Sequence, residues 1–112
     1  MDRGINGPDF GCTHALLLQG PNGPFFRRFA DDLREAGVRV TKVNFHPGDD
    51  LFYRGAEVVR FRGSLDEWPS TLRELLGSRQ LDAVFLFGDG RPIHRAATSV
   101  ARELGIAVWV FE

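Results

Sequence analysis

A short run, Leu81–Phe87, is apolar except for Asp82; it stops at two closely spaced glycines and leads into a helix-like repeat. Such a run is typical of a strand that is buried on both faces of a parallel sheet. After Gly88 and Gly90, Pro92 stands where a helix can begin, because the first helical position needs no N–H. Apolar residues then recur at helical spacing, and a second apolar run, Ile106–Phe111, follows. This order predicts a strand, a loop, a helix and a second, parallel strand.

The same alternation extends back towards the N-terminus. The patterns predict strands at His14–Gln19, Val38–Phe45 and Glu57–Phe61, and a helix over Phe25–Ala36 that Gly37 ends. Five strands alternating with three helices favour an α/β fold, a Rossmann-like open parallel sheet with helices on both faces. Right-handed crossovers between parallel strands give the strand order 3-2-1-4-5.

Two stretches in the middle of the chain carry weaker signals. We predict a loop at His46–Asp50, whereas Leu51–Ala56 begins with apolar residues and fits no single element. Ser64 and Glu67 have the spacing of a capping box, which predicts that a helix begins at Ser64. Pro69 then lies inside that helix and predicts an irregular first turn.

Length and composition restrict the class of protein. With 112 residues, 43% of them hydrophobic and 26% charged, the chain has room for one globular domain, which we place at 14–112 after an irregular leader at 1–13. A net charge of −1 gives no attraction to nucleic acid. Cys12 is the only cysteine, which favours a reducing, cytoplasmic location. No apolar run approaches the roughly 20 residues of a membrane span.

The loop after the first predicted strand holds the first group of candidate binding residues. Ligands of open parallel sheets bind at the carboxyl ends of the strands. Here Gln19 can donate to a sugar hydroxyl, and Gly20, Asn22 and Gly23 follow it. Glycines let a ligand approach the backbone closely. Because the loop matches neither the dinucleotide fingerprint nor the P-loop pattern, a rigid turn without a ligand is the alternative.

Asn44, His46 and Asp49 form a second candidate group, after the second predicted strand. A Rossmann dehydrogenase places a ribose-binding acid in this region, but a solvated loop is an equally good interpretation. His46 and His94, which could bind a metal together with Asp89, lie far apart in the sequence and lack the spacing of metal ligands. We therefore predict neither a metal nor a cofactor.

The loop after the fourth predicted strand carries the candidate catalytic residues, Asp89 and His94, together with Arg91. His94 falls in the first turn of the predicted helix, where the helix dipole favours a neutral imidazole. A neutral imidazole can exchange a proton with a sugar hydroxyl near pH 7, and Arg91 can bind a phosphate or carboxylate. We expect His94 to be partly exposed, so that its replacement by alanine barely changes stability. The alternative is a local helix cap with an ion-pair cluster.

Four motifs occur in order along almost the whole chain after Ala15. They lie within Leu16–Phe26, Val43–Asp49, Phe61–Pro69 and Leu86–Ala97, and Val110–Glu112 follows them. These motifs resemble capsular polysaccharide synthesis and export proteins of the KpsS/LipB type. The resemblance implies a retaining β-Kdo glycosyltransferase, where Kdo is 3-deoxy-manno-octulosonic acid. Such enzymes transfer Kdo from CMP-β-Kdo to a phosphatidylglycerol-type lipid at the cytoplasmic face of the inner membrane.

The resemblance also implies an architecture of two facing Rossmann-like domains, as in GT-B glycosyltransferases. Family members continue past the Val110–Glu112 position into a second domain that holds the sugar nucleotide, so this chain corresponds to the N-terminal, acceptor-side half. The implied partners of the whole protein are CMP-Kdo, a lipid acceptor and the capsule assembly machinery. We expect no transferase activity from this chain alone. The alternative is a stand-alone, non-catalytic module of the same fold that binds a nucleotide or a protein, including a second copy of itself.

Overall fold

The fold is a parallel sheet between two layers of helices. The computed structural model describes residues 12–20, 23–55, 57–88 and 90–111. Residues 1–11 of the predicted leader lie outside this description. The five strands have the order β3-β2-β1-β4-β5, and every pair of neighbours is parallel. This confirms the predicted Rossmann-like topology. The strands are β1 (His14–Leu17), β2 (Arg39–Asn44), β3 (Val58–Arg60), β4 (Ala83–Phe87) and β5 (Ala107–Phe111).

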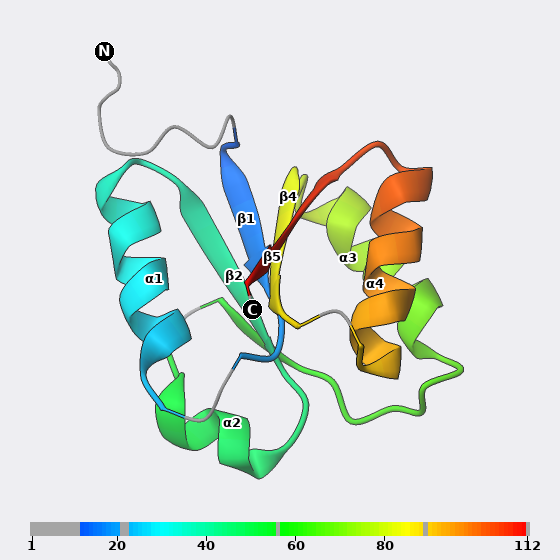
Figure 1. The fold of residues 1–112 in the computed structure, drawn as a ribbon, viewed down its shortest axis with the longest axis horizontal. Coiled ribbons are helices and arrows are strands. Elements are labelled where there is room, and N and C mark those ends of the chain that lie inside the picture. The colour runs from blue at the N-terminus through cyan, green and yellow to red at the C-terminus, as the bar shows by residue number, and fades with distance from the viewer. Residues whose placement is uncertain (1–11, 21–22, 56, 89, 112) are drawn as a thin grey trace.

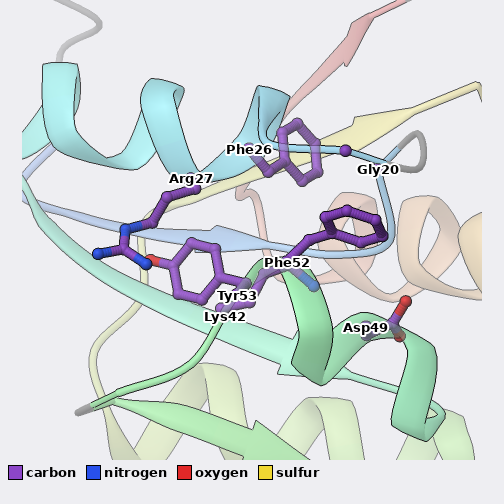
Figure 2. Close-up of a pocket in the computed structure, with 8 residues that line it drawn as sticks. Gly20, Phe26, Arg27, Lys42, Asp49, Phe52 and Tyr53 are labelled. Carbon is purple, nitrogen blue, oxygen red and sulfur yellow. The ribbon is translucent and has the colours of Figure 1, made fainter.

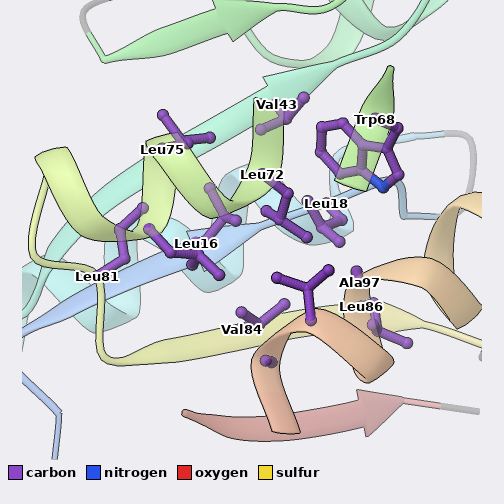
Figure 3. Close-up of a cluster of buried hydrophobic side chains, with 13 residues drawn as sticks. Leu16, Leu18, Val43, Trp68, Leu72, Leu75, Leu81, Val84, Leu86 and Ala97 are labelled. Carbon is purple, nitrogen blue, oxygen red and sulfur yellow. The ribbon is translucent and has the colours of Figure 1, made fainter. Parts of the chain in front are cut away.

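The helices cover both faces of the sheet (Figure 1). Those of the described residues are α1 (Phe25–Glu35), α2 (Pro47–Phe52), α3 (Trp68–Ser78) and α4 (Pro92–Glu103). Helices α3 and α4 pack on one face, where their apolar residues meet Leu16 and Val84 of the central strands and Leu18, which follows β1 (Figure 3). On the other face, α1 packs on Leu17 and Phe85. The central strands are therefore buried on both sides, as their continuous apolar runs predict. None of the helices in the described ranges is long and apolar enough to cross a membrane.

Glycines end two of the helices, as the sequence predicts. Gly37 follows α1 with φ +86°, and Gly105 follows α4 with φ +71°. Residues with a side chain rarely adopt this left-handed conformation, which turns the chain out of the helix and into the next strand.

The predicted loop at His46–Asp50 is wrong, because Pro47 is the first residue of the short helix α2. The carboxylate of Asp49 accepts the backbone N–H of Phe45 at 2.7 Å and thereby fixes the turn between β2 and α2. Proline at the first helical position loses no hydrogen bond. Local capping by Asp49 therefore converts an apparent loop into a helical turn.

The start of α3 also differs from the prediction. The helix begins at Trp68, and residues 64–67 form a turn. Half of the predicted capping box is present within that turn, because Glu67 Oε1 accepts the backbone N–H of Ser64 at 2.7 Å. Since the helix starts four residues later than expected, Pro69 falls in its first turn, where its missing N–H has no helical partner to lose.

Candidate functional site

Three loops meet at the carboxyl edge of the sheet, and one polar side chain from each joins a hydrogen-bonded cluster. Gln19 follows β1, His46 follows β2 and Arg91 follows β4, and these loops lie at the lower edge of the sheet in Figure 1. Arg91 donates to Gln19 Oε1, and Gln19 Nε2 lies 3.0 Å from His46 Nε2. We call Gln19, His46 and Arg91 the carboxyl-edge cluster. The structure thus brings together residues from all three groups that the sequence singled out.

The carboxyl-edge cluster offers mainly hydrogen-bond donors to a ligand. Arg91 and His46 are exposed, and Gln19 is half-buried between them. A guanidinium group binds phosphate or carboxylate through two parallel hydrogen bonds, and an amide or an imidazole can bind a sugar hydroxyl. Because β1 and β4 are neighbours at the centre of the sheet, the cluster lies where open parallel sheets bind their ligands. The arrangement suits an anionic or hydroxyl-rich ligand.

The other candidates after β2 stabilise α2. Asn44 is fully buried, and its amide donates to Asp50 Oδ1 at 2.8 Å and to the carbonyl of Tyr53 at 2.9 Å. The hydrogen bond from Asn44 holds the pKa of Asp50 below its ordinary value, with help from Arg60 and Arg62 and against the opposing effect of burial. Asn44 therefore connects β2 to α2 through buried hydrogen bonds and is not exposed at the carboxyl edge of the sheet.

His94 is fully buried, so the expectation of a partly exposed side chain is wrong. Its Nδ1 lies 2.6 Å from the carbonyl oxygen of Gly88, which follows β4 with φ +73°. A carbonyl only accepts, so this bond places a proton on Nδ1. His94 thus holds the backbone of the β4–α4 loop. A role for His94 as a general acid or base stays a prediction, and its predicted partner Asp89, like Asn22 of the first loop, lies outside the described residues.

A narrow cavity lies beside the carboxyl-edge cluster, between the β1–α1 turn and α2. Its volume is about 20 Å³, which holds about one water molecule. In Figure 2, Gly20 and Phe26 lie on one side of it, and Phe52 and Tyr53 on the other. A β-carbon on Gly20 would lie 2.8 Å from Phe26 Cδ2, so a residue with a side chain fits there only if the Phe26 ring moves. We call this the Lys42 cavity; it is lined by Gly20, Gly23, Phe26, Arg27, Lys42, Asp49, Phe52 and Tyr53.

Lys42 is a residue that the sequence analysis did not single out. The alternation of polar and apolar residues along Val38–Phe45 gave no sign that its side chain is buried, yet only 4% of the residue is exposed. Its ammonium group donates to the carbonyl of Val43 and to Asn44 Oδ1, both at 2.8 Å. Burial lowers the pKa of Lys42 from 10.5 to about 8, against the opposing charges of Asp49 and Asp50. One feature of the sequence could have drawn attention to Lys42, because it is the single lysine of the chain.

This lowered pKa predicts that the protein becomes more stable as the pH rises. Below pH 8, Lys42 is charged in both the folded and the unfolded chain, whereas between pH 8 and 10.5 only the unfolded chain keeps the proton. The free energy of unfolding should therefore gain about 2 kcal/mol between pH 7 and pH 10 from this residue. Urea denaturation across this range measures the gain. The variant Lys42→Met should lack it, and an equal pH dependence in both proteins would contradict the assignment.

The chain is similar to capsule polysaccharide proteins over about a quarter of their length. It is 44% identical over 103 residues to the capsule polysaccharide modification protein LipB of Neisseria meningitidis, from both a serogroup A and a serogroup B strain. It is 37% identical over 97 residues to the capsule polysaccharide export protein KpsS of Escherichia coli. The matches cover 90% and 87% of this chain, respectively, but 25% of each relative. No family model matches the chain.

Two solved structures share the fold. The C-terminal domain of PF1911 hydrogenase from Pyrococcus furiosus has a TM-score of 0.64 at 18% identity, and the match covers 88% of this chain and 90% of that domain. The Bordetella bronchiseptica enzyme WbmH, solved in complex with NAD+, has a TM-score of 0.60 at 14% identity, over 84% of this chain and 36% of the enzyme. At these identities the likeness concerns the fold alone. The sequence matches, in turn, confirm the resemblance to the capsule polysaccharide modification and export proteins, over about a quarter of their length.

Proposed function

We propose that this chain is the N-terminal, acceptor-side domain of a capsular polysaccharide modification or export protein. The observation that carries the proposal is the 44% identity to LipB over 90% of the chain. The carboxyl-edge cluster supports it, because Arg91, Gln19 and His46 offer donors that suit the hydroxyl and carboxylate oxygens of an acidic sugar, or a phosphate.

We further propose that the whole protein transfers Kdo from CMP-β-Kdo to a phospholipid. In this proposal the chain forms one side of the cleft of a two-domain GT-B enzyme, which works at the cytoplasmic face of the inner membrane with the capsule assembly machinery. Both substrates are anionic, and an exposed arginine is the side chain best suited to bind a carboxylate or a phosphate. Arg91 then contacts the substrate, and His94 positions the loop that carries Arg91 through its bond to Gly88.

A domain exchange tests the proposed function. We expect that LipB of Neisseria meningitidis still supports a surface capsule when its matched segment is replaced by this chain. In that chimera, Arg91→Ala should lower the capsule signal, because the loss of a charge-assisted hydrogen bond to an anionic substrate weakens binding about 10- to 100-fold. Flow cytometry with an anti-capsule antibody measures the capsule, and immunoblotting measures the amount of chimera.

Arg102→Ala is the matched control, since Arg102 is an exposed arginine in the last turn of α4, away from the carboxyl-edge cluster. It removes the same charge and should leave the capsule unchanged. A chimera that is present at the level of normal LipB but gives no capsule contradicts the proposal. Equal losses from Arg91→Ala and Arg102→Ala contradict the assignment of Arg91 to the substrate site.

A further inference from the structure

Lys42 stands apart from every other basic residue of the chain. The sequence contains 14 lysine and arginine residues, and Lys42 is the only lysine among them. A buried charge is costly unless it is paired or hydrogen-bonded, and lysine is rarely buried. Only 4% of Lys42 is exposed, and the residue lines a cavity rather than the packed apolar core. A buried cation that lines a cavity is a candidate binding site.

The ammonium group keeps one donor for a ligand. An ammonium has three N–H donors, and Lys42 uses two of them for the carbonyl of Val43 and for Asn44 Oδ1. Within the part of the chain that the structure describes, the third donor has no acceptor within hydrogen-bond distance. The ring of Tyr53 packs beside the ammonium, with its centroid 5.8 Å from Nζ, and so holds the side chain in place.

More basic than acidic residues line the cavity. Lys42 and Arg27 are the two cations on its walls, and Asp49 is the one anion among the residues described as lining it. Asp49 already accepts the backbone N–H groups of Phe45 and His46, at 2.7 and 3.4 Å, which offsets part of its charge. The cavity has room for about one water-sized atom. A ligand can therefore insert one oxygen while the rest of it stays outside.

We propose that Lys42 binds one oxygen of an anionic group, a phosphate or a carboxylate, that enters the Lys42 cavity between the β1–α1 turn and α2. Gly23 leaves the ligand access to the wall opposite α2, because a β-carbon there would have no atom within 4 Å. This site is separate from the contact that Arg91 makes in the proposed function. It rests only on the chemistry of the cavity and holds whether or not the whole protein transfers Kdo.

The single lysine makes a direct test simple. Protein grown with ¹³C- and ¹⁵N-labelled lysine gives one lysine side-chain signal by NMR, that of Lys42. Sodium phosphate and sodium acetate are added separately at pH 7, and sodium chloride keeps the ionic strength constant. We expect a saturable shift of the Lys42 ¹³Cε signal with a dissociation constant of about 10 mM or tighter. The pKa of Lys42 should rise on binding, because an anion favours the ammonium form.

The two anions distinguish the sources of the oxygen. Saturation by phosphate alone assigns the site to phosphoryl groups, saturation by acetate alone assigns it to carboxylates, and saturation by both indicates a general anion site. If neither anion shifts the Lys42 signal beyond the chloride control, the cavity holds water only and the proposal is overturned.

A variant pair provides the second test. Because Lys42→Met contains no lysine, the backbone amide signals of Gly20 and Gly23 are used to measure anion binding in both variants. Lys42→Met should weaken the binding of the preferred anion at least about 10-fold, the effect of one charge-assisted hydrogen bond. Arg102→Met removes the same charge far from the cavity and should bind as the unchanged protein does. Equal binding by Lys42→Met would overturn the proposal, and if that variant does not fold, the titration of the labelled protein still decides.

Discussion

Replacing Trp68 with alanine is expected to lower the free energy of unfolding by about 3–5 kcal/mol. The side chain is completely buried at the start of α3. Its rings lie 5.1 Å, between centroids, from both Phe45 and Phe61, and its Nε1 donates to the carbonyl of Ile93 at 3.0 Å. The substitution therefore leaves a large cavity and removes the bond that joins the first turns of α3 and α4.

Urea denaturation followed by circular dichroism measures this loss. The control is Trp109→Ala, which changes the other tryptophan of the chain, on the edge strand β5. Trp109 is 43% exposed and stacks on Phe85 at 6.1 Å between centroids, so its truncation should cost about 1 kcal/mol. Equal losses from the two variants would show that Trp68 is not part of the packed core. Each variant keeps one tryptophan, so fluorescence can follow both transitions as a second probe.

Replacing His94 with alanine is expected to cost about 2–4 kcal/mol of stability. The sequence led to the opposite expectation, that of a partly exposed residue whose replacement barely changes stability. The structure reverses it because His94 is fully buried and its Nδ1 donates to the carbonyl of Gly88. Without the imidazole, a cavity opens beneath the first turn of α4, and a carbonyl at the start of the β4–α4 loop loses its donor.

Two further variants distinguish the contribution of the hydrogen bond to Gly88 from that of the packing of the imidazole. His94→Asn keeps an N–H donor close to the position of Nδ1 and should recover part of the stability that His94→Ala loses. His46→Ala removes an exposed histidine of the carboxyl-edge cluster, which is also the N-cap residue of α2, and should cost less than about 1 kcal/mol. If His94→Ala is as stable as the unchanged protein, the bond to Gly88 contributes nothing to the fold.

The sheet topology was predictable from the sequence because each strand and helix carries its own local signal. The run Ala83–Phe87 is apolar over its whole length, as a strand covered on both faces must be. Ile106–Phe111 is equally apolar, although its strand β5 lies at the edge of the sheet and is largely exposed. Gly37 and Gly105 mark the helix ends. Once strands and helices alternate, right-handed crossovers leave few possible strand orders. The order found, β3-β2-β1-β4-β5, is the predicted one.

Burial at the candidate site was not predictable, because it depends on residues that pack from elsewhere in the chain. The alternating pattern of its strand suggests that Lys42 is a polar surface residue, yet Tyr53 and the β1–α1 turn enclose its side chain. The sequence pattern predicts that His94 is a partly exposed first-turn residue, but the carbonyl that it contacts belongs to the preceding loop. Trp68 belongs to a segment that resembles the capsule proteins, and the structure gives it a role in the core. Local patterns identify elements; they do not show which side chains those elements enclose.

The central position of β1 has a consequence for how the chain folds as it is made. β1 pairs with β2 on one side, and on the other side Leu16 pairs with Val84, 68 residues further along the chain. The entropy of closing such a long loop must be overcome before the pairing contributes stability, so sheets of this kind fold slowly. During synthesis, β1 emerges first but gains its second neighbour only after Phe87 has been added. Until then its backbone N–H and C=O groups on that side can pair with another chain. This sheet is therefore open to misassembly in the interval before β4 leaves the ribosome.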